Sequence, residues 1–239
     1  MFLEVKHISK QIGADEVLKD ITISMEKGKI YGFQGKNGCG KSMLMRVICG
    51  LVIPTHGSVT IDGEQLGKEL SFPRSLGMMI EKPGFLGSYT GLQNLEMLAA
   101  IRSELKKKEI EDVLARVGLE DVMHKKYRKY SLGMKQKLGI AAAIMEKPDI
   151  LILDEPTNHL DNKMSDWLEN YLKSFRGVLL MVTHDRYFLD KVTNHIWEVE
   201  GGKVYYYDEN YSGYLERKAE REERELASER KRQSILRSE

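Results

Sequence analysis

The chain has 239 residues, of which 41% are hydrophobic and 31% charged, and its formal net charge at pH 7 is +1. This length suits one α/β domain or two small ones, and the composition excludes a largely disordered chain. The balanced charge gives no overall indication of a nucleic-acid or acidic-lipid partner.

The first eighty residues contain short apolar runs separated by turn residues. Strands are predicted at 2–8, 17–25, 30–33, 58–61 and 76–80 because apolar residues alternate or cluster there. A helix is predicted at 43–48, directly after a glycine-rich segment.

That segment, residues 35–42, matches the phosphate-binding pattern G-x-x-x-x-G-K-[ST]. Its members are Gly35, Lys36, Asn37, Gly38, Cys39, Gly40, Lys41 and Ser42. A strand before it and a helix after it supply the context that the motif requires. The glycines let successive backbone N–H groups turn toward phosphate oxygens, and the helix start adds the positive end of its dipole. We expect Lys41 to contact the β- and γ-phosphates and the Ser42 hydroxyl to ligate Mg²⁺.

The spacing of apolar residues changes to the helical period from Gly91 to Tyr130, which predicts a helical insert in an α/β core. Ser131 is placed to cap a further helix at 133–145. The remaining chain predicts strands at 150–154 and 177–182, a helix at 163–175, a hairpin at 196–199 and 203–207, and a long helix from 214. Opposite charges recur at helical spacing in that last segment, which favours a solvated helix.

Two carboxylates end the buried strand at 150–154. Ligands of open α/β sheets bind at the carboxyl ends of such strands. We therefore expect Asp154 to hold Mg²⁺ and Glu155 to orient and deprotonate the water that attacks the γ-phosphate. His184 follows the next buried strand, so its imidazole is expected at the same sheet edge, beside the γ-phosphate. Together these residues predict hydrolysis of a nucleoside triphosphate.

These motifs resemble those of the ATP-binding cassette (ABC) ATPases over nearly the whole chain. Gly35–Ser42 matches the Walker A loop, Ile150–Asp154 with Glu155 matches the Walker B strand, and His184 matches the switch histidine. The resemblance implies an ATPase that uses ATP and Mg²⁺.

The same resemblance implies a fold of the α/β class, a P-loop NTPase cassette with a mostly parallel core sheet and an antiparallel β subdomain. It also implies a helical subdomain at about 88–147 and a charged C-terminal helix. The cassette is predicted to span residues 1–212, followed by a linker-like tail at 213–239.

The family's signature, Leu-Ser-Gly-Gly-Gln, maps to Tyr130–Met134, where Ser131 and Gly133 are kept and three positions differ. A hydroxyl and N–H groups at a helix start still suit an anion. In the family this signature binds the γ-phosphate held by the opposite subunit. The resemblance therefore implies a head-to-tail dimer with a second cassette, identical or different, and Asp161 in the D-loop match is expected to link the two sites.

Two positions depart from the family pattern. Glu81 replaces the glutamine of the Q-loop, as in exporters of lantibiotic-type antimicrobial peptides, and is expected beside the γ-phosphate. Ile12 falls near the position of the adenine-stacking aromatic residue. Because an isoleucine does not stack as an aromatic ring does, loose selectivity between ATP and GTP is predicted.

The two ends of the chain resemble different branches of the family. Residues 1–158 resemble exporter ATPase subunits, which dock on transmembrane permease subunits, whereas 159–239 resemble the ABC-F translation factors, which act on the ribosome and its rRNA. The segment between Glu81 and Ser131 is exporter-like, without the inserted arm of ABC-F factors or the long coiled coils of the repair-type relatives. With a net charge of only +1, an antimicrobial-peptide or drug exporter is favoured.

The cysteines and the apolar runs of the sequence indicate the cellular compartment in which the protein is expected. Cys39 and Cys49 lie too close in sequence to suggest a disulfide, which favours a reduced cytosolic compartment. We expect no leader segment and no membrane helix, because the apolar runs have the length of strands. The exporter interpretation predicts a cytoplasmic protein, peripheral on the inner face of the cell membrane.

Overall fold

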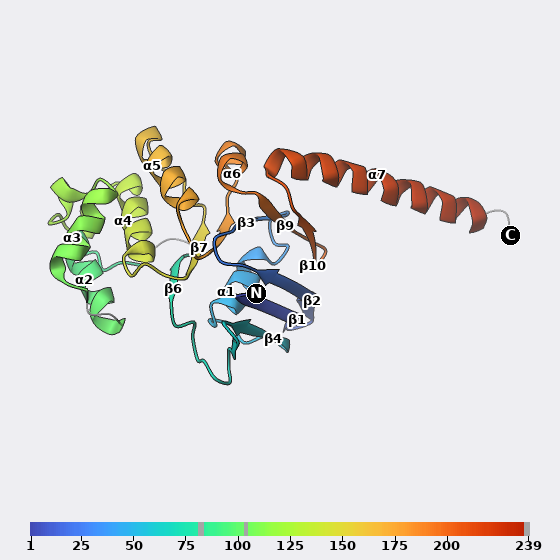
Figure 1. Ribbon diagram of the computed structural model, residues 1–239, viewed down its shortest axis with the longest axis horizontal. Coiled ribbons are helices and arrows are strands. Elements are labelled where there is room, and N and C mark those ends of the chain that lie inside the picture. The colour runs from blue at the N-terminus through green and yellow to red at the C-terminus, as the bar shows by residue number, and fades with distance from the viewer. Residues whose placement is uncertain (81–83, 103–104, 237–239) are drawn as a thin grey trace.

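The structure is a computed structural model that describes residues 1–80, 84–102 and 105–236. Two β-sheets pack around helix α1 (Lys41–Ile48), as Figure 1 shows. In the described residues the larger sheet has the strand order β10-β9-β3-β8-β7-β6, and the smaller sheet has the order β2-β1-β4-β5.

The larger sheet is mostly parallel. Its strands are β3 (Ile30–Gln34), β6 (Leu76–Met79), β7 (Ile150–Asp154), β8 (Val178–Val182), β9 (His195–Glu200) and β10 (Lys203–Tyr207). The pairings among β6, β7, β8, β3 and β9 are parallel, and β10 pairs antiparallel with β9. All five residues of β8 are buried, as expected for a strand covered on both faces. The predicted α/β class with a mostly parallel core sheet is confirmed.

The smaller sheet is antiparallel. Its strands are β1 (Leu3–Ile12), β2 (Asp15–Met25), β4 (His56–Ile61) and β5 (Glu64–Gln65). Strands β1 and β2 are longer than predicted. The predicted segments were too short because bulges interrupt the apolar alternation from which the strands were predicted. His7 and Asp20 both have positive φ there, and His7 Nδ1 lies 2.7 Å from Asp20 Oδ1.

Helices cover both faces of the larger sheet. Helices α2 (Gly91–Arg102), α3 (Lys107–Arg116) and α4 (Leu132–Ile144) gather at one end of the molecule, next to β6 (Figure 1). Helices α5 (Asn162–Lys173) and α6 (Arg186–Val192) follow β7 and β8. Successive side chains of a strand point to opposite faces of the sheet, so alternate residues belong to different hydrophobic cores. In β7, Leu151 and Leu153 pack with α4, α5 and α6, whereas Ile150 and Ile152 pack with α1 and the smaller sheet.

Three local differences from the sequence prediction are apparent. The stretch 91–130 contains α2, α3 and two 3₁₀ turns, Glu120–Val122 and Tyr127–Lys129. Helix α6 was not predicted, because its seven residues are too few for a clear apolar period; Asp185 caps it by accepting from Phe188 N. The last helix, α7 (Tyr211–Leu236), begins three residues before the predicted start and extends away from the body (Figure 1).

Candidate functional site

The phosphate loop joins β3 to α1 between the two sheets. Gly35, Gly38 and Gly40 have φ values of 141°, 79° and 103°, which L side chains rarely adopt. A Cβ on Gly40 would also lie 2.9 Å from Val17 O, and one on Gly35 would clash with Val199 O. Only glycine lets the loop pass this closely to β2 and β9. No acidic residue lies in the first turn of α1, which leaves its N-terminal N–H groups available to an anion.

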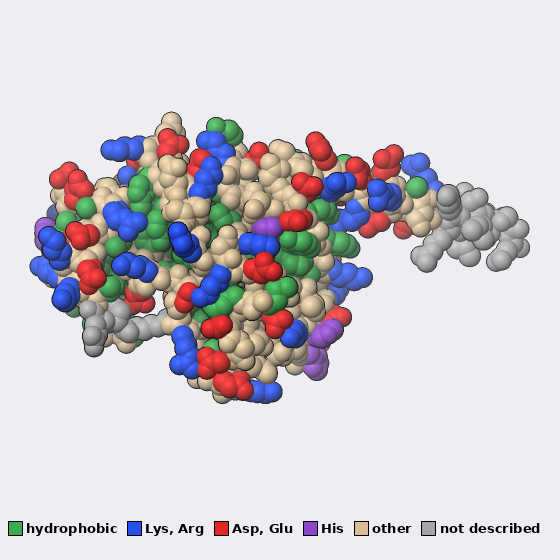
Figure 2. Space-filling model, in the orientation of Figure 1, with side chains coloured by type: hydrophobic (Ala, Val, Ile, Leu, Met, Phe, Trp, Pro, Cys, Tyr) green, Lys and Arg blue, Asp and Glu red, His purple; other side chains and the backbone are tan. Residues whose placement is uncertain are grey.

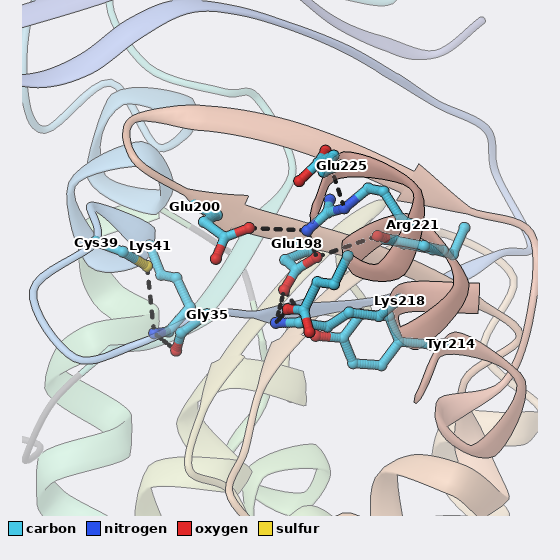
Figure 3. Close-up of polar contacts among 11 residues, drawn as sticks. Gly35, Cys39, Lys41, Glu198, Glu200, Tyr214, Lys218, Arg221 and Glu225 are labelled. Carbon is cyan, nitrogen blue, oxygen red and sulfur yellow. Dashed lines mark hydrogen bonds and ion pairs between the residues drawn. The ribbon is translucent and has the colours of Figure 1, made fainter. Parts of the chain in front are cut away.

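Lys41 is held within the loop. Its Nζ donates to Gly35 O at 2.6 Å and Lys36 O at 3.0 Å, and lies 3.7 Å from Cys39 Sγ (Figure 3). A phosphate oxygen bound by the loop would offer this ammonium a charged acceptor in place of neutral carbonyls.

The acidic ends of the parallel strands meet the loop in one open pocket of about 480 Å³. Its lining residues are Val17, Asn37, Gly38, Gly40, Lys41, Ser42, Met43, Arg46, Asp154, Glu155, Val182 and His184. Most of the loop residues, both carboxylates and the histidine predicted from sequence are therefore brought together. The volume is in the range of small-molecule sites.

Glu155 is held in one direction inside this pocket. Its Oε2 accepts from His184 N at 3.2 Å and from Thr183 Oγ1 at 3.3 Å, and its Oε1 lies 3.6 Å from His184 Nε2. Thr183 was missed by sequence reasoning, although its place at the end of β8 was the available signal. The carboxylate thus faces the pocket beside the imidazole, as a general base near a γ-phosphate requires.

The oxygen donors of the pocket suit Mg²⁺. Ser42 contributes a hydroxyl and Asp154 a carboxylate to the same lining. The described residues contain no cluster of three or more His, Cys, Asp or Glu side chains that would form a protein-only metal site. This donor set fits Mg²⁺, which binds one or two protein oxygens and completes its shell with phosphate oxygens and water.

The signature residues lie outside this pocket. Ser131 caps α4 by accepting from Met134 N at 3.2 Å, and its side chain is exposed. Gly133 is required because a Cβ there would lie 2.6 Å from His159 O. Asp161 caps α5 and pairs with Lys137 at 2.9 Å, an interaction that holds the pKa of Asp161 below its usual value.

Glu81 lies outside the described residues. Ile12 ends β1 with 49% of its surface exposed, and it does not line the nucleotide pocket.

The outer side of the loop faces the C-terminal helix. A small cavity of about 180 Å³ is lined by Gly35, Lys36, Cys39, Glu198, Val199, Glu200, Gly201 and Lys218. Glu198, only 1% exposed, accepts from the Tyr214 hydroxyl and pairs with Lys218 and Arg221 (Figure 3), and it also accepts from the Tyr207 hydroxyl. We call these five residues the tail anchor. The tail anchor was not predicted, because no local sequence pattern indicates which strand the charged C-terminal helix contacts.

An apolar groove of about 430 Å³ lies between the helical group and α1. Its lining residues are Arg46, Leu51, Met78, Met79, Ile80, Gly84, Phe85, Leu98, Gly139 and Ala142. Met78 and Leu98 are 42% and 39% exposed, so apolar surface is open to a partner. Arg46 lines both the groove and the nucleotide pocket.

Comparison with known proteins gives consistent matches to one protein family. A family model described as ABC transporter matches residues 18–158, and a second model with the same description matches 197–239. The uncharacterized ABC transporter ATP-binding protein YybJ of Bacillus subtilis is 46% identical over 183 residues, which is 76% of this chain and 84% of YybJ. A solved ATP-binding subunit of an ABC transporter superposes with a TM-score of 0.79 at 28% identity, covering 87% of this chain and 90% of that one.

Two longer relatives carry names of different activities. The bacitracin transport ATP-binding protein BcrA of Enterococcus faecalis is 43% identical over 66% of this chain, and the energy-dependent translational throttle protein EttA of Mycobacterium tuberculosis is 31% identical over 91%. The chain spans about half the length of each, 52% of BcrA and 44% of EttA.

The loop, the acidic strand ends and these matches define the class: the chain belongs to the ABC transporter family. It is an ATP-binding subunit of that family, with the fold of an ABC cassette and the activity of an ATPase. None of the described helices is both long enough and apolar enough to cross a membrane.

Proposed function

We propose that the predicted site residues divide the work of ATP hydrolysis as follows. Lys41 and the amides of the phosphate loop bind the phosphates, with Ser42 and Asp154 as ligands of Mg²⁺. Glu155 takes a proton from the attacking water, and His184 contacts the γ-phosphate. Bound Mg²⁺ would neutralise charge on the phosphate oxygens. Support comes from the shared pocket and from the hydrogen bonds that direct Glu155 into it.

The proposed active form is a head-to-tail pair of cassettes. Ser131 and Gly133 would then close the nucleotide site of the partner, and Asp161 would connect the two sites. This arrangement is supported by the position of Ser131, which is exposed and does not line the pocket of its own chain. A symmetric pair in which each subunit completes the other's site satisfies this geometry.

The proposed context is export, with a transmembrane permease docked on the apolar groove. The groove is the observation that carries this proposal, because Arg46 borders both groove and nucleotide pocket. A permease segment bound there would be one side chain away from the ATP site. The relationship to BcrA supports an antimicrobial peptide or drug as the substrate class. Such a subunit would lie at the inner face of the cell membrane.

A second candidate is a ribosome-associated factor of the ABC-F type. The length of α7 and the relationship to EttA favour it. Charge favours the exporter instead. On the face shown in Figure 2, Lys and Arg side chains are interspersed with Asp and Glu, whereas RNA-binding surfaces gather positive charge.

Cell fractionation of a Glu155→Gln variant separates the two candidates. This variant is expected to bind ATP without hydrolysing it and so to persist in its partner-bound state. The double variant Lys41→Ala/Glu155→Gln, which is expected to bind ATP more weakly and so to be trapped less, is the matched control. Membrane recovery of the single variant with an integral membrane protein, lost in the control, supports the exporter.

Co-sedimentation of the trapped variant with ribosomes would instead overturn the exporter and support the ABC-F candidate. Undiminished ATP turnover by Glu155→Gln would remove Glu155 from the role of general base, whatever the partner.

A further inference from the structure

A hydrogen bond from α4 reaches the backbone of the residue assigned as general base. Gln136 Nε2 donates to Glu155 O at 2.8 Å and to Pro156 O at 3.1 Å. Gln136 is half-buried and does not line the nucleotide pocket, so we expect no direct contact between its side chain and ATP bound there. Both protons of its amide group are therefore directed at the carbonyls that follow β7.

Glu155 needs such support because its backbone is strained. Its φ is 49°, in the left-handed region that costs a non-glycine residue roughly 1 kcal/mol or more. Its own N–H donates to Val182 O at 2.8 Å, which fixes the peptide before it. The peptide after it is fixed by Gln136. The direction of the Glu155 side chain is thus set from both sides, by β8 and by α4.

Other contacts keep α4 in register with this segment. The close approach of Gly133 to His159 O and the Lys137–Asp161 pair lie on either side of Gln136 along the helix. Helix α4 and residues 155–161 are therefore in contact at three positions along the helix. A displacement at the start of α4, where Ser131 lies, would be transmitted through Gln136 to the carbonyl of Glu155.

We propose that Gln136 is a positioning residue for ATP hydrolysis, which holds Glu155 in its productive direction and couples it to the signature end of α4. This inference rests on the proposed role of Glu155 as general base. Misplacing a catalytic group by about 1 Å can lower the rate about a hundredfold. Loss of the two hydrogen bonds that fix the backbone of Glu155 is therefore expected to lower the rate of hydrolysis.

Steady-state kinetics of Gln136→Leu tests the proposal, because leucine keeps most of the volume but donates no hydrogen bond. We expect kcat for ATP to fall by about ten- to a hundredfold, with KM and the dissociation constant of ATP within about twofold of wild type. The kcat of Gln136→Glu should fall further, since an ionised carboxylate donates no hydrogen bond and repels both carbonyl oxygens. Gln93→Leu is the matched control, because it removes one hydrogen bond at the start of α2, which Gln93 Oε1 accepts from Thr90 N, and leaves Glu155 untouched.

The outcomes are separable. A melting temperature close to wild type with reduced kcat and unchanged KM supports the positioning role. Wild-type kcat in both Gln136 variants, beside an inactive Glu155→Gln protein, overturns this inference alone. Turnover by Glu155→Gln overturns it together with the proposed base. Failure of both Gln136 variants to fold would assign Gln136 a structural role and contradict the proposal.

Discussion

Lys41 has two neutral acceptors within the loop, the carbonyl oxygens of Gly35 and Lys36. Bound phosphate would replace them with charged oxygens, and hydrogen bonds to charged groups contribute about 1.5–3 kcal/mol. We therefore expect Lys41→Ala to weaken ATP binding by about ten- to a hundredfold. Equilibrium dialysis would measure this, with the exposed Lys6→Ala as control. An unchanged dissociation constant would remove Lys41 from the binding site.

The two cysteines should differ in reactivity. Burial raises the pKa of Cys49 to about 12, so almost no reactive thiolate forms at neutral pH. Cys39 is partly accessible and lines the small cavity behind the loop. We expect N-ethylmaleimide to modify Cys39 alone in the folded protein and to lower ATPase activity, because the adduct displaces the loop. Bound ATP should slow the reaction.

Mass spectrometry of the treated protein would locate the adduct, and Cys39→Ser protein should gain no adduct under the same conditions. Full ATPase activity with stoichiometric modification of Cys39 would contradict the prediction.

Residues whose position follows from local sequence could be placed from the sequence. The loop, Asp154, Glu155 and His184 follow apolar strands, and parallel strands bring their carboxyl ends to one edge of a sheet. Gln136 and Glu198 could not be predicted, since their hydrogen-bond partners lie 9 to 20 residues away along the chain and belong to other elements or loops. Only tertiary packing determines which carbonyl or ammonium they meet.

At the scale of elements, the tail anchor determines where α7 lies. Lys218 and Arg221 are mostly buried around Glu198, and Arg221 also stacks 3.8 Å over the Tyr205 ring. Removing the central carboxylate would leave both cations without their shared partner. Breaking a buried pair in this way costs about 3–5 kcal/mol, and partial exposure of the cations lowers this estimate.

We therefore expect Glu198→Gln to lower the free energy of unfolding by about 2–4 kcal/mol. Urea denaturation followed by circular dichroism would measure the loss. Glu220→Gln, whose carboxylate is exposed and pairs with Arg224 at 3.6 Å, is the matched control and should change stability by less than about 0.5 kcal/mol. Equal effects of the two substitutions would show that the anchor does not stabilise the fold.

Element prediction succeeded where apolar periods were long. The core strands β7 and β8 are continuous apolar runs, and both lie where the sequence indicated. Helix α6 is too short to show a period, and the bulges at His7 and Asp20 hide the alternation of β1 and β2. In each case the missing information is tertiary, because packing on the sheet stabilises these irregular elements.

At the scale of the molecule, the proposed head-to-tail pair places the two halves of a nucleotide site in different parts of one chain. The pocket is lined by the loop and strand ends, while Ser131 lies exposed at the start of α4. A head-to-tail pair predicts that Lys41→Ala damages the loop half of a site and Ser131→Glu damages the signature half. Glutamate at a helix start is compatible with the helix dipole but repels a phosphate.

Each variant alone should be inactive, because every site of its homodimer has one damaged half. In a mixed dimer both damaged halves fall in one site, and the second site is intact. Mixing the two purified variants in equal amounts should therefore restore about a quarter of the wild-type ATPase rate, if subunits exchange freely and the sites act independently. The measurement is ATPase activity against mixing ratio, with a maximum expected near equal amounts. Activity that stays at the level of the separate variants throughout would mean that each chain completes its own site, and the head-to-tail arrangement would be wrong.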